Sequence, residues 1–264
     1  MSLQLKTLNI VCSQTELSKI PDGKVLINTI NAHSFNVAQK DELFAKALFT
    51  IENGKWRNEN EEGYVKYLIP DGAGIVMACQ WLKTKSQPKE RIAGWDLFAF
   101  EMQSLEGKGK KEDGRGPRVM FLGSSERVLA LIRQQAAIDY PNLEVVTYSP
   151  PYKPEFSQED NKEMIQAINK ANPDLLWIGM TAPKQEKWTY LHWKELDIHC
   201  HVGTIGAVFD FYAGTVKRAP LWWQKYSMEW LYRLLSEPKR MWRRYVIGNP
   251  LFLWNILKEK IGMK

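Results

Sequence analysis

Short apolar runs alternate with amphipathic stretches along most of the chain. The apolar runs have strand length and predict six strands, at residues 24–29, 67–70, 118–123, 143–148, 174–179 and 198–203. Helix-period stretches follow the first five, at about residues 34–49, 71–82, 124–139, 158–171 and 186–196. Strands that alternate with helices predict a parallel sheet with helices on both faces. We therefore expect an α/β fold of the Rossmann-like kind.

The carboxyl ends of parallel strands share one edge of a sheet, and ligand crevices lie at that edge. In the predicted sheet this edge holds Thr29, Asp71 and Ser124, together with the loops that follow Gly179 and Gly203. We therefore expect the functional residues to lie along this rim.

The strand pattern ends near Ala213, where amphipathic helical segments begin. The change predicts an α/β catalytic core over residues 1–212 and a C-terminal helical appendage over residues 213–264. A Gly-rich, charged segment at residues 106–117 predicts a surface connection within the core.

The positive charge of the chain is concentrated in this appendage. The whole chain has a net charge of +6, whereas residues 214–264 carry eleven Lys or Arg and three Glu, a net +8. Five of the eleven tryptophans also lie there, at Trp222, Trp223, Trp230, Trp242 and Trp254. The basicity is therefore local, and the rest of the chain is slightly acidic.

Three interpretations fit a basic, aromatic tail. It can be an ordinary solvated helical face, a nucleic-acid-binding surface, or a surface that docks on an anionic membrane. The tryptophans favour the membrane, because Trp prefers the level of the lipid headgroups. A nucleic-acid-binding α/β protein that uses this tail is the alternative function.

Other features of the sequence indicate a cytoplasmic protein. No apolar run approaches the roughly 20 residues that span a bilayer, and the N-terminus lacks the apolar core of a signal peptide. The three scattered cysteines, Cys12, Cys79 and Cys200, fit a reducing compartment.

Three strand ends carry candidate chemistry. Asp71-Gly72 is a turn signal, and it also places a carboxylate at the mouth of the crevice as a candidate general base. Gly123 and Ser124 stand where a strand becomes a helix, so they form either an ordinary N-cap or a phosphate site. Gln185 follows a third strand and either is solvated or holds a nucleotide or sugar.

The sequence does not favour a metal or a cofactor. His199 and His201 alternate on one strand, but no third ligand accompanies them. The chain contains no Asp-x-Asp pair, no P-loop and no dinucleotide fingerprint, which disfavours a nucleotide-dependent oxidoreductase.

Taken together in order, several segments resemble the WecG/TagA/CpsF glycosyltransferases, glycosyltransferase family 26. The matching segments are Thr29-x-Asn31, Pro70-Asp71-Gly72-x-Gly74, Arg91-x-x-Gly94-x-Asp96-Leu97, Phe121-Leu122-Gly123, Gly179-x-x-Ala182-Pro183-Lys184-Gln185-Glu186, Phe209-Asp210-Phe211-x-Ala213-Gly214, Lys217-Arg218-Ala219-Pro220, and Glu229-Trp230-Leu231-Tyr232-Arg233-Leu234 with Glu237-Pro238. They extend from about residue 25 to residue 250. The chain departs from the family pattern in two places. Family members commonly have a Gly-Val-Gly-Gly-like loop where this chain has residues 203–208, and the insertion at residues 106–117 is longer than is usual in the family.

The resemblance implies an inverting transferase that moves a sugar from a UDP-sugar to a membrane lipid-linked saccharide. The sugar would be N-acetylmannosamine, its uronic acid or a hexose, in the synthesis of a cell-surface polysaccharide. Such an enzyme is peripheral on the inner face of the bacterial cytoplasmic membrane, docks through its C-terminal appendage, and needs no cofactor. Self-association into a homo-oligomer is compatible with the pattern.

The resemblance also implies roles for residues. Asp71 matches the proposed general base, and the positions that match the acceptor or sugar pocket are Thr29, Asn31, Arg91 and Gln185. Arginines of the appendage would lie over the donor diphosphate, and the candidates are Arg233, Arg240, Arg243 and Arg244. These arginines would replace the metal that many transferases use.

Overall fold

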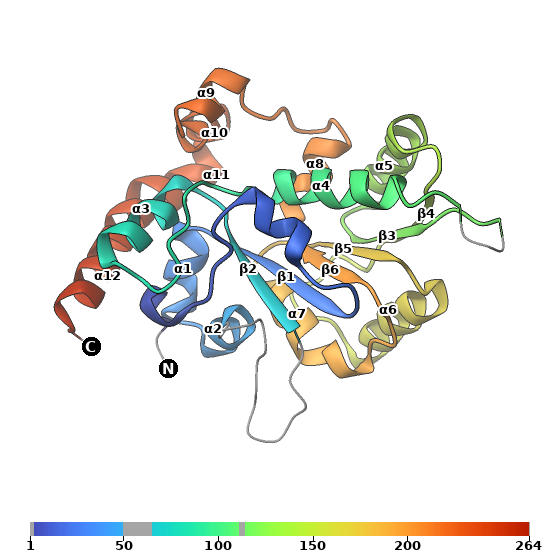
Figure 1. Cartoon of the computed structure of the whole chain (residues 1–264), viewed down its shortest axis with the longest axis horizontal. Helices are drawn as coiled ribbons and strands as arrows, with labels where there is room; N and C mark the ends of the chain where they lie inside the picture. Colours follow the sequence, from blue (N-terminus) through green and yellow to red (C-terminus); the bar gives the residue numbers. More distant parts are fainter. Residues whose placement is uncertain (1–2, 50–64, 111–113, 264) are drawn as a thin grey trace.

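Six parallel strands form one sheet in the computed structural model, which describes residues 3–49, 65–110 and 114–263 (Figure 1). The strands are β1 Val25–Ile30, β2 Val65–Pro70, β3 Arg118–Gly123, β4 Glu144–Tyr148, β5 Leu175–Gly179 and β6 His201–Thr204. Their order is β2-β1-β6-β5-β3-β4, and every neighbouring pair is parallel. The α/β fold and the six strands predicted from the apolar runs are therefore confirmed.

Helices cover both faces of the sheet. One face carries α4 Gly94–Glu106, α5 Glu126–Asp139 and α8 Gly206–Tyr212, and the other carries α6 Gln158–Ala171 and α7 Lys184–His192 (Figure 1). Because both faces are covered, the central strands are apolar on both sides. Along β3, Val119 and Phe121 face the first layer, whereas Met120 and Leu122 face the second.

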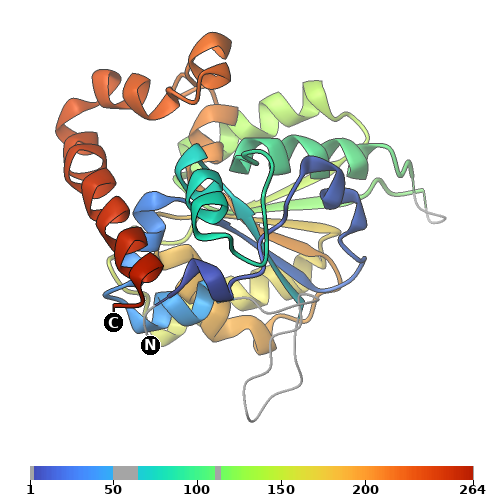
Figure 2. The same cartoon turned by 60° about the vertical axis from the view of Figure 1, so that its left-hand side comes forward.

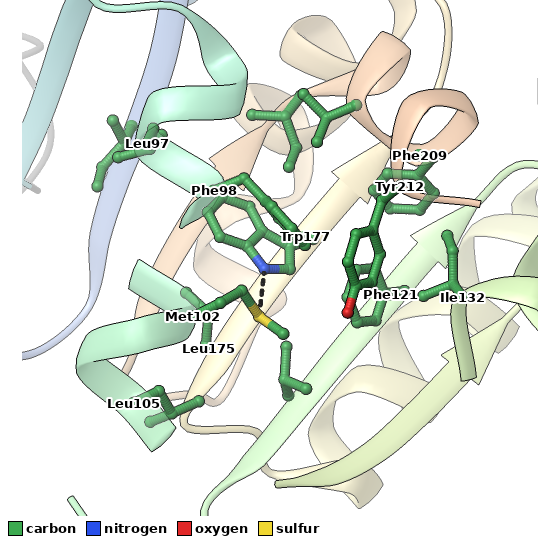
Figure 3. Close-up of a cluster of buried hydrophobic side chains, with 14 of the residues drawn as sticks. Leu97, Phe98, Met102, Leu105, Phe121, Ile132, Leu175, Trp177, Phe209 and Tyr212 are labelled. Atoms are coloured by element: carbon green, nitrogen blue, oxygen red, sulfur yellow. Dashed lines mark hydrogen bonds between the residues drawn. The ribbon is translucent and has the colours of Figure 1, made fainter. Parts of the chain in front are cut away.

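Aromatic side chains fill the layer between the sheet and α4. Trp177 of β5 is fully buried, and its indole N–H donates to the Met102 sulfur at 3.4 Å (Figure 3). Phe98 packs against the Trp177 ring with 5.5 Å between centroids. This layer fixes α4, which begins next to the carboxyl rim of the sheet.

Two of the predicted helices have different boundaries in the structure. The single helix expected at residues 34–49 is two helices, α1 Ala32–Ala38 and α2 Glu42–Leu48. Asp41 separates them, because its side chain accepts a hydrogen bond from the Phe44 amide at 3.0 Å and begins a new helix. The helix expected at residues 186–196 is α7, followed by the 3₁₀ turn Trp193–Glu195.

Helix α4 has no counterpart among the predicted elements. Its start is fixed by Asp96, whose carboxylate accepts a hydrogen bond from the Ala93 amide at 2.8 Å. Its buried face consists of Leu97, Phe98, Met102 and Leu105, which pack in one cluster against the sheet. The predicted connection at residues 106–117 follows it, and residues 111–113 of that connection lie outside the described residues.

A further cluster closes the β2 edge of the sheet. It joins α1, α2 and α3 Ala73–Leu82 with the last helix, α12 Gly248–Ile261, and with the N-terminal 3₁₀ turn Leu5–Thr7. Phe252 of α12 meets Phe35 of α1 edge to face, with 5.6 Å between ring centroids. A second 3₁₀ turn, Gln14–Lys19, packs against the layer that contains α4.

The chain reaches α12 through a row of short helices. These are α9 Leu221–Lys225, α10 Glu229–Ser236, α11 Pro238–Trp242 and the π-helical turn Arg243–Ile247. They arch from α8 over one end of the core, after which α12 runs along α1 (Figure 2). The helices expected in the appendage are thus present, and the division of the chain at residues 212 and 213 stays a prediction. None of the helices within the described residues is long and apolar enough to cross a membrane.

Candidate active site

The ends of β1 and β2 bring Asn31 and Asp71 together. The two strands are paired in register, with Ile30 opposite Pro70, so the next residues are neighbours at the rim. The Asp71 amide donates to the Ile30 carbonyl at 2.8 Å, and the Asn31 Nδ2 atom lies 3.4 Å from Asp71 Oδ2. Asn31 also caps α1 by accepting from the Ser34 amide, which fixes its side chain.

The electrostatic surroundings of Asp71 suit a base. Asp71 as a whole is half-buried, and burial of its carboxyl group raises the pKa above the ordinary value, as does the nearby charge of Glu229. Arg244, Arg91 and the hydrogen bond from Asn31 lower the pKa, and the net shift is upward. A raised pKa increases the proton affinity of the ionised carboxylate.

Arg91 is held beside Asp71 by two contacts. The Ile92 amide donates to the Pro70 carbonyl at 3.0 Å, which keeps this loop next to the end of β2. Arg91 Nη1 donates to Glu229 Oε2 of α10 at 2.8 Å, and both side chains are largely buried. Burial lowers the pKa of Arg91. The hydrogen bond to Glu229 and the negative charge of Glu229 outweigh this effect, so the pKa of Arg91 is raised overall. The pair joins the core to the C-terminal helices.

The four predicted diphosphate arginines differ in burial and in their partners. Arg244 is half-buried, and burial lowers its pKa, with Arg233, Asp71 and Arg240 among the charges that act on it. The buried Nε atoms of Arg233 and Arg244 have no hydrogen-bond partner in the described parts of the chain. Arg240 is exposed and pairs with Glu237 at 2.9 Å, and the exposed Arg243 lies over the Trp242 ring at 5.3 Å. Arg244 and Arg233 are therefore the members with a buried donor that has no partner among the described residues.

Gln185 is buried and acts as a brace between two loops. Its side-chain oxygen accepts from the Met180 amide at 3.1 Å and from the Gly206 amide at 3.2 Å, so it connects the segments after β5 and β6. Its Nε2 atom donates to Glu186 at 2.8 Å, and burial raises the pKa of Glu186 to about 7. Thr29 is partly exposed near the end of β1, opposite Ile69. Substrate contact by Thr29 and Gln185 stays a prediction.

Gly123 and Ser124 lie at the end of β3. The chain continues from β3 to β4 on one side, and from the neighbouring β5 to β6 on the other, so the strand order reverses between β3 and β5. Gly123 has a φ of +123°, and a Cβ atom there would lie 2.4 Å from the Gly179 carbonyl oxygen, so only glycine fits. Ser125, one residue further on, caps α5. β3 is four places from β2 in the sheet, roughly 19 Å at the usual strand spacing. Gly123 and Ser124 thus lie at a different part of the rim from Asp71.

Three residues near Asp71 were not among the predicted site residues. Glu229 pairs with Arg91, and Arg218 lies over the Trp95 ring at 5.3 Å with its Nη2 atom 3.9 Å from Asp96. His33 of α1 lies near Arg244. Burial, the larger cause, and the positive charge of Arg244 together lower the pKa of His33 to about 4. Glu229 and Arg218 lie inside the motifs that carry the family resemblance, which is the signal that could have identified them.

Known proteins resemble this chain over most of its length. A protein of Bacillus subtilis (strain 168) named N-acetylglucosaminyldiphosphoundecaprenol N-acetyl-β-D-mannosaminyltransferase is 31% identical over 198 residues, 75% of this chain and 71% of that protein. A protein of the same name from Staphylococcus aureus (strain MW2) is 29% identical over 199 residues, again 75% and 71%. The model of the Glycosyl transferase WecG/TagA/CpsF family matches residues 10–264. The chain belongs to the WecG/TagA/CpsF family of glycosyl transferases.

Proposed function

We propose that this chain transfers N-acetylmannosamine, its uronic acid or a hexose from a UDP-sugar to a membrane lipid-linked saccharide. The name of the Bacillus subtilis relative favours N-acetylmannosamine and an acceptor that carries N-acetylglucosaminyl diphosphate. The half-buried Asp71 carboxylate, which Asn31 contacts beside a group of arginines, is the observation that carries the proposal.

The proposed reaction is one displacement at the anomeric carbon of the donor. The acceptor hydroxyl gives its proton to the Asp71 carboxylate while its oxygen bonds to that carbon. The bond between the carbon and the phosphate oxygen breaks, and UDP leaves with the electron pair. The unpaired donors of Arg244 and Arg233 suit the charge that grows on the diphosphate.

Asp71→Asn tests the proposal. The amide keeps the size of the side chain and cannot accept the proton, so kcat is expected to fall by about 10²- to 10⁴-fold. The assay follows UDP release from UDP-N-acetylmannosamine with a lipid-linked N-acetylglucosaminyl diphosphate in detergent. Asp139→Asn, an exposed carboxylate at the end of α5, is the matched control. Turnover near the normal rate in Asp71→Asn, with an unchanged melting temperature, would remove Asp71 from the role of base.

We also propose that the C-terminal helices hold the enzyme on the inner face of the cytoplasmic membrane. Trp222 and Trp230 are 55% and 41% exposed, and Trp242 is 43% exposed beside the cationic Arg243. Trp prefers the headgroup level, and each nearby cation adds about 1 kcal/mol at an anionic surface. Flotation with anionic vesicles, run beside a nucleic-acid gel shift, tests this step. A gel shift without flotation would favour the nucleic-acid alternative.

A further inference from the structure

Helix α3 of the core presents two large apolar side chains to solvent. Met77 is 68% exposed and Trp81 is 49% exposed. They are four residues apart in the helix, so they lie on one face, opposite the buried Ile75, Cys79 and Leu82. This outward face belongs to the core and not to the C-terminal appendage.

Helix α12 continues this face from the other end of the sequence. Its outward residues are Leu253, Trp254, Leu257 and Ile261, with exposures of 65%, 49%, 37% and 57%. Lys260 joins the two helices, because its Nζ atom donates to the Trp81 carbonyl at 2.7 Å and lies 5.4 Å from the centre of the Trp81 ring. Figure 1 shows α3 and α12 at the same edge of the molecule. We define the α3–α12 face as Met77, Trp81, Leu253, Trp254, Leu257 and Ile261.

Within the described residues, lysines border the α3–α12 face. Lys83 follows α3 and is exposed, and Lys258 lies 5.6 Å from the Trp254 ring. Neither helix contains an acidic residue except Glu259. The Glu259 carboxylate points inward and accepts hydrogen bonds from the Leu5 and Lys6 amides at 3.0 and 2.7 Å. The outer surface is therefore apolar with a cationic border.

Exposed apolar side chains bordered by lysines indicate which kind of partner the α3–α12 face binds. Single exposed apolar residues are normal on a protein surface, and Ile138 and Leu191 are examples elsewhere on this chain. Six such residues on two adjacent helices form a patch that calls for a partner. Tryptophans beside lysines suit the boundary between headgroups and acyl chains of an anionic bilayer.

We propose that α3 and α12 dock together on an anionic membrane surface, so that the docking surface includes the catalytic core as well as the tail. The proposal rests on the proposed membrane attachment and extends it to α3. Helix α3 begins at Ala73, two residues after Asp71. Docking through α3 therefore ties the position of the candidate base to the surface that carries the lipid-linked acceptor.

Vesicle binding by matched double variants of the full chain tests the proposal. Met77→Ser/Trp81→Ser removes the core half of the face, and Ile138→Ser/Leu191→Ser removes two exposed apolar residues from α5 and α7. The probe is sedimentation with phosphatidylglycerol vesicles, with phosphatidylcholine vesicles as the uncharged comparison. We expect Met77→Ser/Trp81→Ser to bind phosphatidylglycerol at least about tenfold more weakly than the normal chain. The Ile138→Ser/Leu191→Ser variant should bind as the normal chain does.

A third variant separates this proposal from the one on which it rests. If the normal chain does not bind phosphatidylglycerol vesicles, the membrane attachment itself is wrong. If Trp222→Ser/Trp230→Ser abolishes binding while Met77→Ser/Trp81→Ser binds normally, attachment stands and the role of α3 is overturned. Sedimentation velocity adds one outcome. A dimer that Met77→Ser/Trp81→Ser converts to a monomer, with vesicle binding unchanged, would make the face a contact between two copies.

Discussion

The sheet rim and the C-terminal helices meet at the same site, but their polar groups are held differently. At the rim, Asn31 caps a helix and Gln185 accepts two backbone amides, so these side chains are already committed to the fold. In the C-terminal helices, the buried Nε atoms of Arg233 and Arg244 have no hydrogen-bond partner in the described residues. Buried polar groups are normally paired, so these two unpaired Nε atoms indicate that the tail has donors available to bind an anion.

The apolar groups of the two regions show the same contrast. At the rim, Ile30 and Ile69 are completely buried beside Asn31 and Asp71. In the tail, Trp222, Trp230 and Trp242 remain between 41% and 55% exposed. The apolar side chains of the rim are thus buried within the chain, whereas the outer tail leaves large apolar side chains exposed. Helix α12 is the exception, because one of its faces joins the core.

Replacing Phe252 tests whether α12 is structurally part of the core. Phe252 is 4% exposed and packs against Phe35 of α1. We expect Phe252→Ala to reduce the free energy of unfolding by about 3–5 kcal/mol in urea denaturation, because it leaves a cavity. Leu253→Ala is the matched control, since Leu253 is 65% exposed, and it should change stability by less than about 0.5 kcal/mol. Equal losses in the two variants would place α12 outside the core.

Two consecutive arginines provide the next test. Arg244 is half-buried near Asp71, whereas Arg243 is exposed over Trp242. If Arg244 binds the leaving diphosphate, Arg244→Ala should reduce kcat by about 10²- to 10³-fold with a detergent-solubilised acceptor. The reduction for Arg243→Ala should be less than about tenfold, because its side chain is exposed to solvent and lies over the Trp242 ring. The reverse order of effects would contradict the assignment.

The sequence predicted the strands well for a physical reason. Both faces of the sheet are covered, so strands such as β3 and β5 are continuous apolar runs that are visible without a structure. Helix boundaries were less visible, because the periodicity at residues 34–49 continues across Asp41 although this residue begins a new helix. Helix α4 was missed even though Leu97, Phe98, Met102 and Leu105 lie on one helical face.

The sequence could predict only those site residues that directly follow a strand. Asn31 and Asp71 each follow a strand, so their place on one rim could be predicted, and the pairing of β1 with β2 makes them neighbours. The distance of Gly123 from Asp71 depends on the order of the strands, which the sequence does not contain. Glu229 was missed because its charge alone does not reveal a role and its partner Arg91 is distant in sequence, so only its place in the family motif could have identified it.

Glu229 lies where the two regions join, and its charge gives the smallest predicted effect. Asp71 must be ionised to accept a proton, so kcat/KM falls as pH decreases through its pKa. Glu229→Gln removes a negative charge that raises this pKa and leaves the positive charge of Arg91 uncompensated, and both changes lower the pKa of Asp71. The acidic limb of the pH profile should therefore move to lower pH.

A second ion pair supplies the control for Glu229→Gln. Lys187 of α7 and Asp41, the N-cap residue of α2, also form a 2.8 Å pair. Lys187→Gln removes a similar contact, so it reproduces any general effect of losing an ion pair and should leave the acidic limb in place. If Glu229→Gln lowers activity without moving the acidic limb, Glu229 only fastens α10 to the core. If the limb moves to higher pH, the electrostatic account of Asp71 is wrong, because losing the charge of Glu229 and leaving Arg91 uncompensated both lower the pKa of Asp71.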